Sequence, residues 1–92
     1  MNNPARNILL KEIGERLKEI RDEQSQEDFA LDLLTIKQTI SKYENGKIIP
    51  GGEFLYMLYK KRFVNINWLL TGEGNKFNDN RKIAIQKLKK YS

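Results

Sequence analysis

The chain has 92 residues, a formal net charge of +5, and neither cysteine nor histidine. This length suits one small domain, and without those two residue types disulfides, thiolate metal sites and the usual general bases are excluded, so we expect no catalysis, metal or cofactor. No apolar run approaches the roughly 18 residues of a membrane span, and the N-terminal residues lack the apolar region of a signal peptide, so we expect a cytoplasmic protein with no membrane partner.

The N-terminal part of the chain predicts one long helix. Asn3 can cap a helix, and Pro4 suits its first position, where the missing N–H costs nothing. Apolar residues then recur at steps of three and four with charged residues between them, namely Leu10, Ile13, Leu17 and Ile20. We therefore expect a helix over about residues 4–22.

Two short helices are predicted next, close together. Ser25 offers a cap, with Asp28 three residues later in the manner of a capping box, and predicts a helix over about residues 26–33. The stretch TIKQTISKYENGK follows at residues 35–47 and predicts another helix, which Gly46 ends by accepting a left-handed conformation. Two short helices joined by a few residues are typical of a helix-turn-helix.

The second of these short helices has two different faces. Ile36, Ile40 and Tyr43 share one side, which we expect to face the core. Polar residues without a carboxylate occupy the opposite side and its edge, namely Gln38, Ser41, Lys42 and Asn45. Such side chains can hydrogen-bond base edges or phosphates, although a merely solvated surface is the simpler alternative.

Glu44 lies on the buried flank of the same helix, at a projected angle of about 40° from Ile40. A buried carboxylate needs a partner, because an unpaired buried charge is costly. Arg21, at the end of the first predicted helix, is the candidate. We expect a structural ion pair that orients the helix over residues 35–45.

Two further helices are predicted in the second half of the chain. Pro50 prevents direct continuation of the preceding helix. A fourth helix then ends in the run Lys60-Lys61-Arg62, which suits the negative end of a helix dipole. Asn65 can cap a short fifth helix, and Gly72 ends it. The fold class is therefore all-α, with four or five short helices around one core.

The C-terminal part divides into a linker and a basic tail. We expect a helix-turn-helix domain over residues 1–74, a linker over 75–80 and a tail over 81–92. Residues 79–92 carry +4 of the net charge of +5 and leave +1 for the rest. The tail has a helical apolar pattern but is too short to be stable alone, so it either packs on this chain, packs on a second copy, or frays. The apolar positions are Ala84, Ile85, Leu88 and Tyr91.

Several of these segments together resemble a known family. The run SQEDFALDLLTIKQTISKYENGKIIP, with RLKEIR before it and NWLLTGEG after it, is similar to the lambda-repressor-like, Cro-type helix-turn-helix family, often called XRE. The resemblance covers roughly residues 8–74. It implies a lambda-repressor-like bundle whose third helix lies in the major groove, and a homodimer bound to a palindromic double-stranded DNA operator.

The resemblance also implies roles for individual residues. The positions that match base readers are Lys37, Gln38 and Lys42, with Ser41 nearby, and Ile36 would touch a thymine methyl if it reaches the groove. The positions that match phosphate contacts are Gln26, Thr39, Asn45 and Lys47. Arg21 and Glu44 match a structural ion pair of the family.

Three positions depart from the family pattern. Leu34 and Phe63 stand where a turn glycine is common, and Ile36 stands where a small hydroxyl residue usually caps the third helix. Thr35 is then a candidate cap one residue earlier, with Gln38 as the other half of a capping box. In that arrangement Gln38 would be lost as a base reader.

The leading functional hypothesis is a sequence-specific DNA-binding transcriptional regulator, of the phage or prophage repressor type or an antitoxin-type autoregulator. The alternative is a protein-interaction module in which the same face binds a protein partner. A further alternative is that the chain is the N-terminal half of a longer repressor, as TGEG before a linker indicates. Salt dependence separates the first two, because phosphate contacts release counterions.

Overall fold

A computed structural model describes residues 3–78 and shows a bundle of five helices. In chain order these are α1 (Pro4–Arg21), α2 (Gln26–Asp32), α3 (Lys37–Glu44), α4 (Gly52–Arg62) and α5 (Ile66–Thr71). Over this range the only β pairing is an isolated antiparallel bridge between Val64 and Phe77. The prediction of an all-α fold is confirmed. The predicted tail over 81–92 lies outside the described residues.

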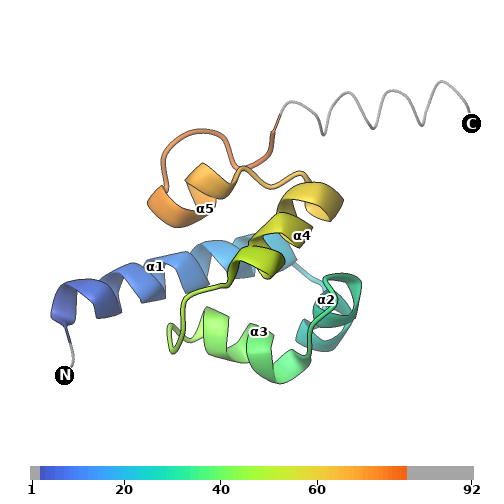
Figure 1. Cartoon of the computed structure of the whole chain (residues 1–92), viewed down its shortest axis with the longest axis horizontal. Helices are drawn as coiled ribbons and strands as arrows, with labels where there is room; N and C mark the ends of the chain where they lie inside the picture. The colour runs from blue at the N-terminus through green and yellow to red at the C-terminus, as the bar shows by residue number, and fades with distance from the viewer. Residues whose placement is uncertain (1–2, 79–92) are drawn as a thin grey trace, which may run out of the picture.

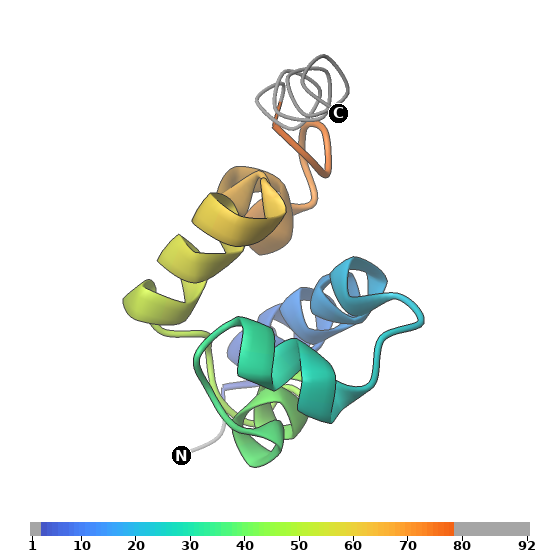
Figure 2. The same cartoon turned by 90° about the vertical axis from the view of Figure 1, so that its right-hand side faces the viewer.

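Helix α1 runs through the middle of the molecule and lies between two pairs of helices (Figure 1). It contacts α3 on one side and α5 on the other. Figure 2 shows α4 and α5 above and α2 and α3 below. Every element contributes to a single core, whose most deeply buried side chains are Ile13, Leu17, Phe29, Leu33, Ile40, Leu58, Val64 and Leu69.

Side-chain caps fix the start of three helices. The amide oxygen of Asn3 accepts from two backbone N–H groups of the first turn of α1. The hydroxyl of Ser25 accepts from the N–H of Asp28 at 3.0 Å, and the amide oxygen of Asn65 accepts from the first turn of α5. The sequence predicted these three starts because the caps are local patterns.

Helix α3 starts without a side-chain cap, which corrects the prediction that Thr35 caps it. The N–H of Thr35 donates to the carbonyl of Ala30 at 2.9 Å, and that of Leu34 donates to Leu31 at 3.3 Å. This pattern is the Schellman closure of α2, so Thr35 still belongs to the end of the preceding helix. Ile36 occupies the N-cap position instead and is 61% exposed, so its predicted place in the core was wrong.

Two non-glycine residues adopt the left-handed conformation where the resembled family commonly has glycine. Leu34 has φ +59° in the turn between α2 and α3, and Phe63 has φ +58° at the end of α4. Side chains at such positions crowd the backbone. Both turns therefore have the left-handed conformation without glycine, the residue that adopts it most easily.

Residues just after α5 pack back onto the bundle. The N–H of Asn65 donates to the carbonyl of Lys76 at 2.9 Å, and that of Asn78 donates to Phe63 at 2.8 Å. The side chain of Phe77 packs against the core. The described beginning of the predicted linker thus pairs with the connection between α4 and α5. Within residues 3–78, none of the helices combines the length and apolar character required to cross a membrane.

Candidate nucleic-acid interface

The position of α3 depends on a close approach to α1. A Cβ atom added at Gly14 would lie 2.6 Å from the carbonyl oxygen of Glu44 and 2.7 Å from that of Tyr43. Both distances are too short for a real contact, so only glycine allows α1 to pass here. On the other side, the ring centroid of Tyr43 lies 4.9 Å from that of Phe54 on α4. The C-terminal end of α3 is therefore held between two helices.

An ion pair ties the end of α3 to the end of α1. The Nε and Nη2 atoms of Arg21 donate to the two carboxylate oxygens of Glu44 at 2.7 and 2.9 Å. Glu44 is only 2% exposed, and the side-chain amide of Gln26 donates to it at 2.9 Å. The buried carboxylate is thus satisfied by three charge-assisted or polar hydrogen bonds, which orient α3 relative to α1 and α2.

The positive charge of Arg21 is stable toward high pH. The hydrogen bond to Glu44 raises the pKa of the Arg21 guanidinium above its ordinary value, although partial burial opposes this. A pKa that rises on folding gives stability that is present below the ordinary value and is lost only as pH rises through the raised value. The guanidinium of Arg21 therefore keeps its charge as the pH rises.

The outward side of α3 carries the predicted base readers. Lys37, Gln38 and Lys42 are exposed, and no hydrogen bond or ion pair within residues 3–78 engages their side chains. Ser41 is half-buried and accepts from the side-chain amide of Asn45 at 3.2 Å. Since α3 has no side-chain cap, the amide of Gln38 is not used at the helix start. This side of α3 is open to a ligand.

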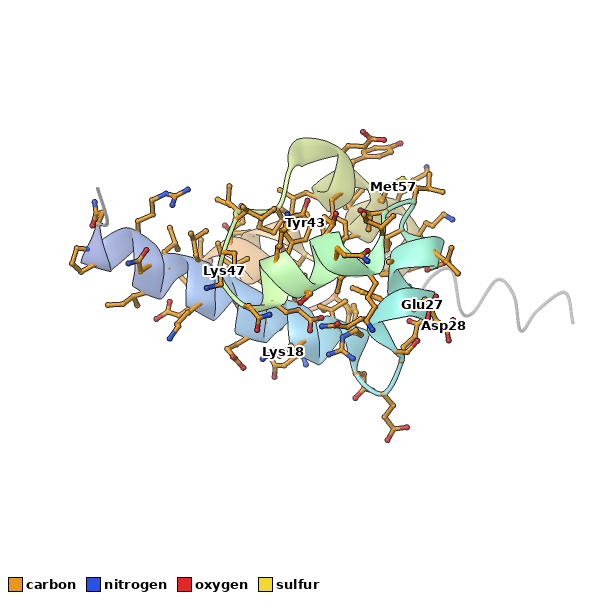
Figure 3. The ribbon with its side chains drawn as sticks, turned by 90° about the horizontal axis from the view of Figure 1, so that it is seen from below. Lys18, Glu27, Asp28, Tyr43, Lys47 and Met57 are labelled. Carbon is orange, nitrogen blue, oxygen red and sulfur yellow. The ribbon has the colours of Figure 1, made fainter. Side chains whose placement is uncertain are left out.

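The predicted phosphate contacts are spread over three places. Asn45 and Lys47 are exposed after the end of α3, and Thr39 is half-buried within it. Gln26 starts α2 and is held against Glu44. Figure 3 shows this side of the molecule, with Lys47 beside α1 and the acidic side chains of Glu27 and Asp28 away from it on α2. Lys47 is therefore separated from these two carboxylates, whereas Gln26 is their neighbour in the first turn of α2.

Two arginines have structural contacts that the sequence did not predict. The Nε of Arg16 donates to the carbonyl of Leu69 at 2.6 Å and so closes the end of α5. Arg62 donates to Asp32 at 2.8 Å and to Gln24 at 2.7 Å, and therefore does more than suit the dipole of α4. These partners lie far apart in the sequence, and no local pattern signals them.

A groove of about 520 Å³ lies where α1 passes the loop after α3. Its polar lining includes two basic residues of α1 that were not predicted as site residues. These residues are Arg6 and Lys11. In the sequence they are distinguished only by lying before and directly after Leu10, where the buried stripe of α1 begins. The polar and glycine residues that line the groove are Arg6, Asn7, Lys11, Asn45, Gly46 and Lys47.

Comparison with known families identifies a matching domain family. The model of a family described as a helix-turn-helix domain matches residues 14–75, which include the second half of α1 and all of α2, α3, α4 and α5. Neither the curated proteins nor the solved structures gave a significant match.

Proposed function

We propose that this chain, which belongs to the helix-turn-helix domain family, is a sequence-specific transcriptional regulator that reads double-stranded DNA with α3. The family indicates a DNA-binding regulator, and the surface of α3 supports the finer proposal. Its one carboxylate, Glu44, is buried, whereas Lys37, Gln38 and Lys42 are exposed without an intramolecular partner. An α-helix with such a face fits the major groove and offers donors to base edges.

The chemistry of each exposed side chain suggests a base. The lysines at 37 and 42 suit the O6 and N7 acceptors of guanine, and Gln38 suits the N6 and N7 positions of adenine. Ser41 can bond to either purine at the edge of the face. Ile36 is 61% exposed at the start of α3, where it can contact a thymine methyl.

Phosphate contacts would fix the register of α3 in the groove. Asn45 and Lys47 are exposed at its C-terminal end, and Thr39 lies along it. One amide N–H of Gln26 is held by Glu44, and the second can donate to a phosphate. The same carboxylate therefore positions α3 and the candidate phosphate donor at the start of α2.

We further propose a dimer on a palindromic operator, acting as a repressor of the phage or prophage type. Two recognition helices would then contact half-sites about 34 Å apart, one turn of DNA. Changing the spacing between half-sites by five base pairs places them on opposite sides of the duplex. Binding of the dimer should fall sharply with that insertion and stay low with ten base pairs, because the half-sites then lie on the same side of the duplex but about twice as far apart as the two recognition helices. Fluorescence anisotropy measures both affinities.

A protein-interaction module is the second candidate. It is favoured by the apolar side chains around the turn between α2 and α3, because Leu31 is 69% exposed, Leu34 70% and Ile36 61%. Exposed apolar surface of this kind can bind a partner protein. A protein-interaction module predicts an affinity for the partner protein that changes little with salt concentration.

Selection of bound sequences from a random duplex pool tests the proposal. We expect enrichment of a half-site that is repeated with dyad symmetry, and an affinity that falls steeply between about 50 and 200 mM salt. Negligible binding to every duplex even at low salt would overturn the DNA-binding proposal and favour the protein partner.

A further inference from the structure

The first part of α1 is a helical extension that buries no side chain in the bundle. Every residue from Asn3 to Leu9 is exposed, and the buried stripe of α1 begins only at Leu10. Isolated helical turns of this length are marginal in water. Figures 1 and 3 show that this extension projects beyond the C-terminal end of α3, past the loop that joins α3 to α4.

The groove between this extension and the loop collects cationic side chains. Arg6 and Lys11 line it from α1, and Lys47 lines it from the loop. No acidic residue lines the groove, and no ion pair within residues 3–78 neutralises these three side chains. The side-chain amides of Asn7 and Asn45 add uncharged donors to the same lining.

The two walls of the groove are held in a fixed relation. Gly46, with φ +69°, passes so close to α1 that an added Cβ would lie 3.1 Å from the backbone nitrogen of Lys11. The loop after α3 is itself closed by hydrogen bonds from Gly46 to Tyr43 and from Lys47 to Lys42. Lys11 therefore packs directly against the loop after α3, and Arg6 lies on the continuation of the same helix.

We infer that this groove binds the sugar-phosphate backbone of DNA beside the base pairs that α3 contacts. The inference rests on the proposed function and extends its phosphate contacts to α1. Arg6 and Lys11 are separated by about 7.5 Å along the helix axis, which corresponds to about two base-pair steps. The two residues project about 140° apart around the helix axis, but both line the groove. They can therefore contact different phosphates of one strand, while Lys47 contacts the strand from the other wall.

If the groove binds the DNA backbone, it can contribute to affinity only when the duplex extends beyond the base pairs that α3 contacts. The experiment uses the half-site sequence found by selection, in one long duplex and in one trimmed to the base pairs adjacent to α3. The Arg6→Gln/Lys11→Gln double variant should lose about 1.8 from the salt slope on the long duplex, because each phosphate contact contributes about 0.9. Its affinity should then fall about twelve-fold less than that of the wild type between 50 and 200 mM salt.

The trimmed duplex provides the internal control. On it, the double variant and the wild type should have the same affinity and salt slope, because the phosphates that the groove contacts are missing. Lys60→Gln is the matched protein control, since Lys60 is an exposed lysine on α4 outside the groove. It should leave the salt slope unchanged on both duplexes. Circular dichroism melting of each variant verifies that the fold is retained.

Several results would overturn the inference, and they separate it from the proposed function. If the wild type binds no duplex, both fail. If it binds the selected site but the double variant keeps the wild-type slope on the long duplex, the groove assignment alone fails. If inorganic phosphate shifts the amide resonances of Arg6 and Lys11 while duplex length has no effect, the groove binds a free anion instead of DNA.

Discussion

Glu44 is a buried carboxylate whose hydrogen bonds to Arg21 and Gln26 connect α3 to α1 and α2. Its carboxylate is almost fully buried, and its oxygens are bonded by Arg21 and Gln26. Removing a partner from such a group leaves an uncompensated buried charge, which is much more harmful than losing a surface ion pair. The single carboxylate of α3 is therefore buried and bonded to α1 and α2, while the exposed face of the helix carries only cationic and uncharged side chains.

Arg21→Met should lower the free energy of unfolding by about 3 kcal/mol, near the lower end of the range for a broken buried pair, because Gln26 keeps one bond to Glu44. Urea denaturation measures this. Lys18→Met is the matched control, since Lys18 pairs with Glu15 at 3.4 Å on an exposed surface and should cost less than about 1 kcal/mol. Equal losses in the two variants would contradict the structural role of the Arg21 pair.

Leu34→Gly should stabilise the protein by about 0.5 to 1 kcal/mol. Leu34 has φ +59° and is 70% exposed, so glycine relieves the left-handed strain with little loss of packing. The greater freedom of glycine in the unfolded chain offsets part of the gain.

The substitution Leu31→Gly should change the stability in the opposite direction. Leu31 is 69% exposed but lies within α2, where glycine should cost about 1 kcal/mol. The midpoint of thermal unfolding should therefore rise for Leu34→Gly and fall for Leu31→Gly. A fall in both would contradict the strain assigned to Leu34.

At the scale of elements, the start of α3 is where local reasoning was least successful. The pattern of apolar residues placed Ile36 in the core, but the closure of α2 uses the backbone of Leu34 and Thr35 and delays α3 until Lys37. Ile36 consequently points to solvent, at the leading end of the proposed recognition helix. The end of α3 was easier to predict, because Gly46 is a strong local stop signal.

Gly14→Ala tests the contact between α1 and α3. Alanine is normally the better helix former by about 1 kcal/mol, yet its Cβ would meet two backbone carbonyl oxygens at 2.6 and 2.7 Å. We expect a net destabilisation of about 1 to 3 kcal/mol, because α3 must move away. DNA affinity should fall as well, since the proposed base readers move with α3.

Gly52→Ala is the control for that substitution. Gly52 begins α4, and an added Cβ there meets no atom within 4 Å. Its free energy of unfolding should be unchanged or slightly increased. If both alanine variants behave alike in urea, the close approach at Gly14 does not determine the position of α3.

At the scale of the whole molecule, the sequence predicted what local patterns encode. The five helices follow from apolar spacing, caps and glycine stops, and the Arg21–Glu44 contact follows from a helical projection together with the cost of a buried charge. Contacts between distant segments have no local sequence pattern. Examples are the hydrogen bond from Arg62 to the carboxylate of Asp32 and that from the N–H of Asn78 to the carbonyl of Phe63. The groove beside α1 was also not predicted, since it exists only when α1 packs against the loop after α3.

The central claim is that the exposed face of α3 reads base sequence while the loop after it contacts the backbone. Its most direct test compares Lys42→Ala and Lys47→Ala on the selected operator and on random duplexes, with affinities measured across a salt series. Lys42→Ala should cost about 1 to 3 kcal/mol on the operator and relax the preference at one base pair, while Lys47→Ala should weaken all sequences alike and reduce the salt slope by about one. If both variants lose the same affinity on operator and random DNA, α3 does not read sequence through Lys42.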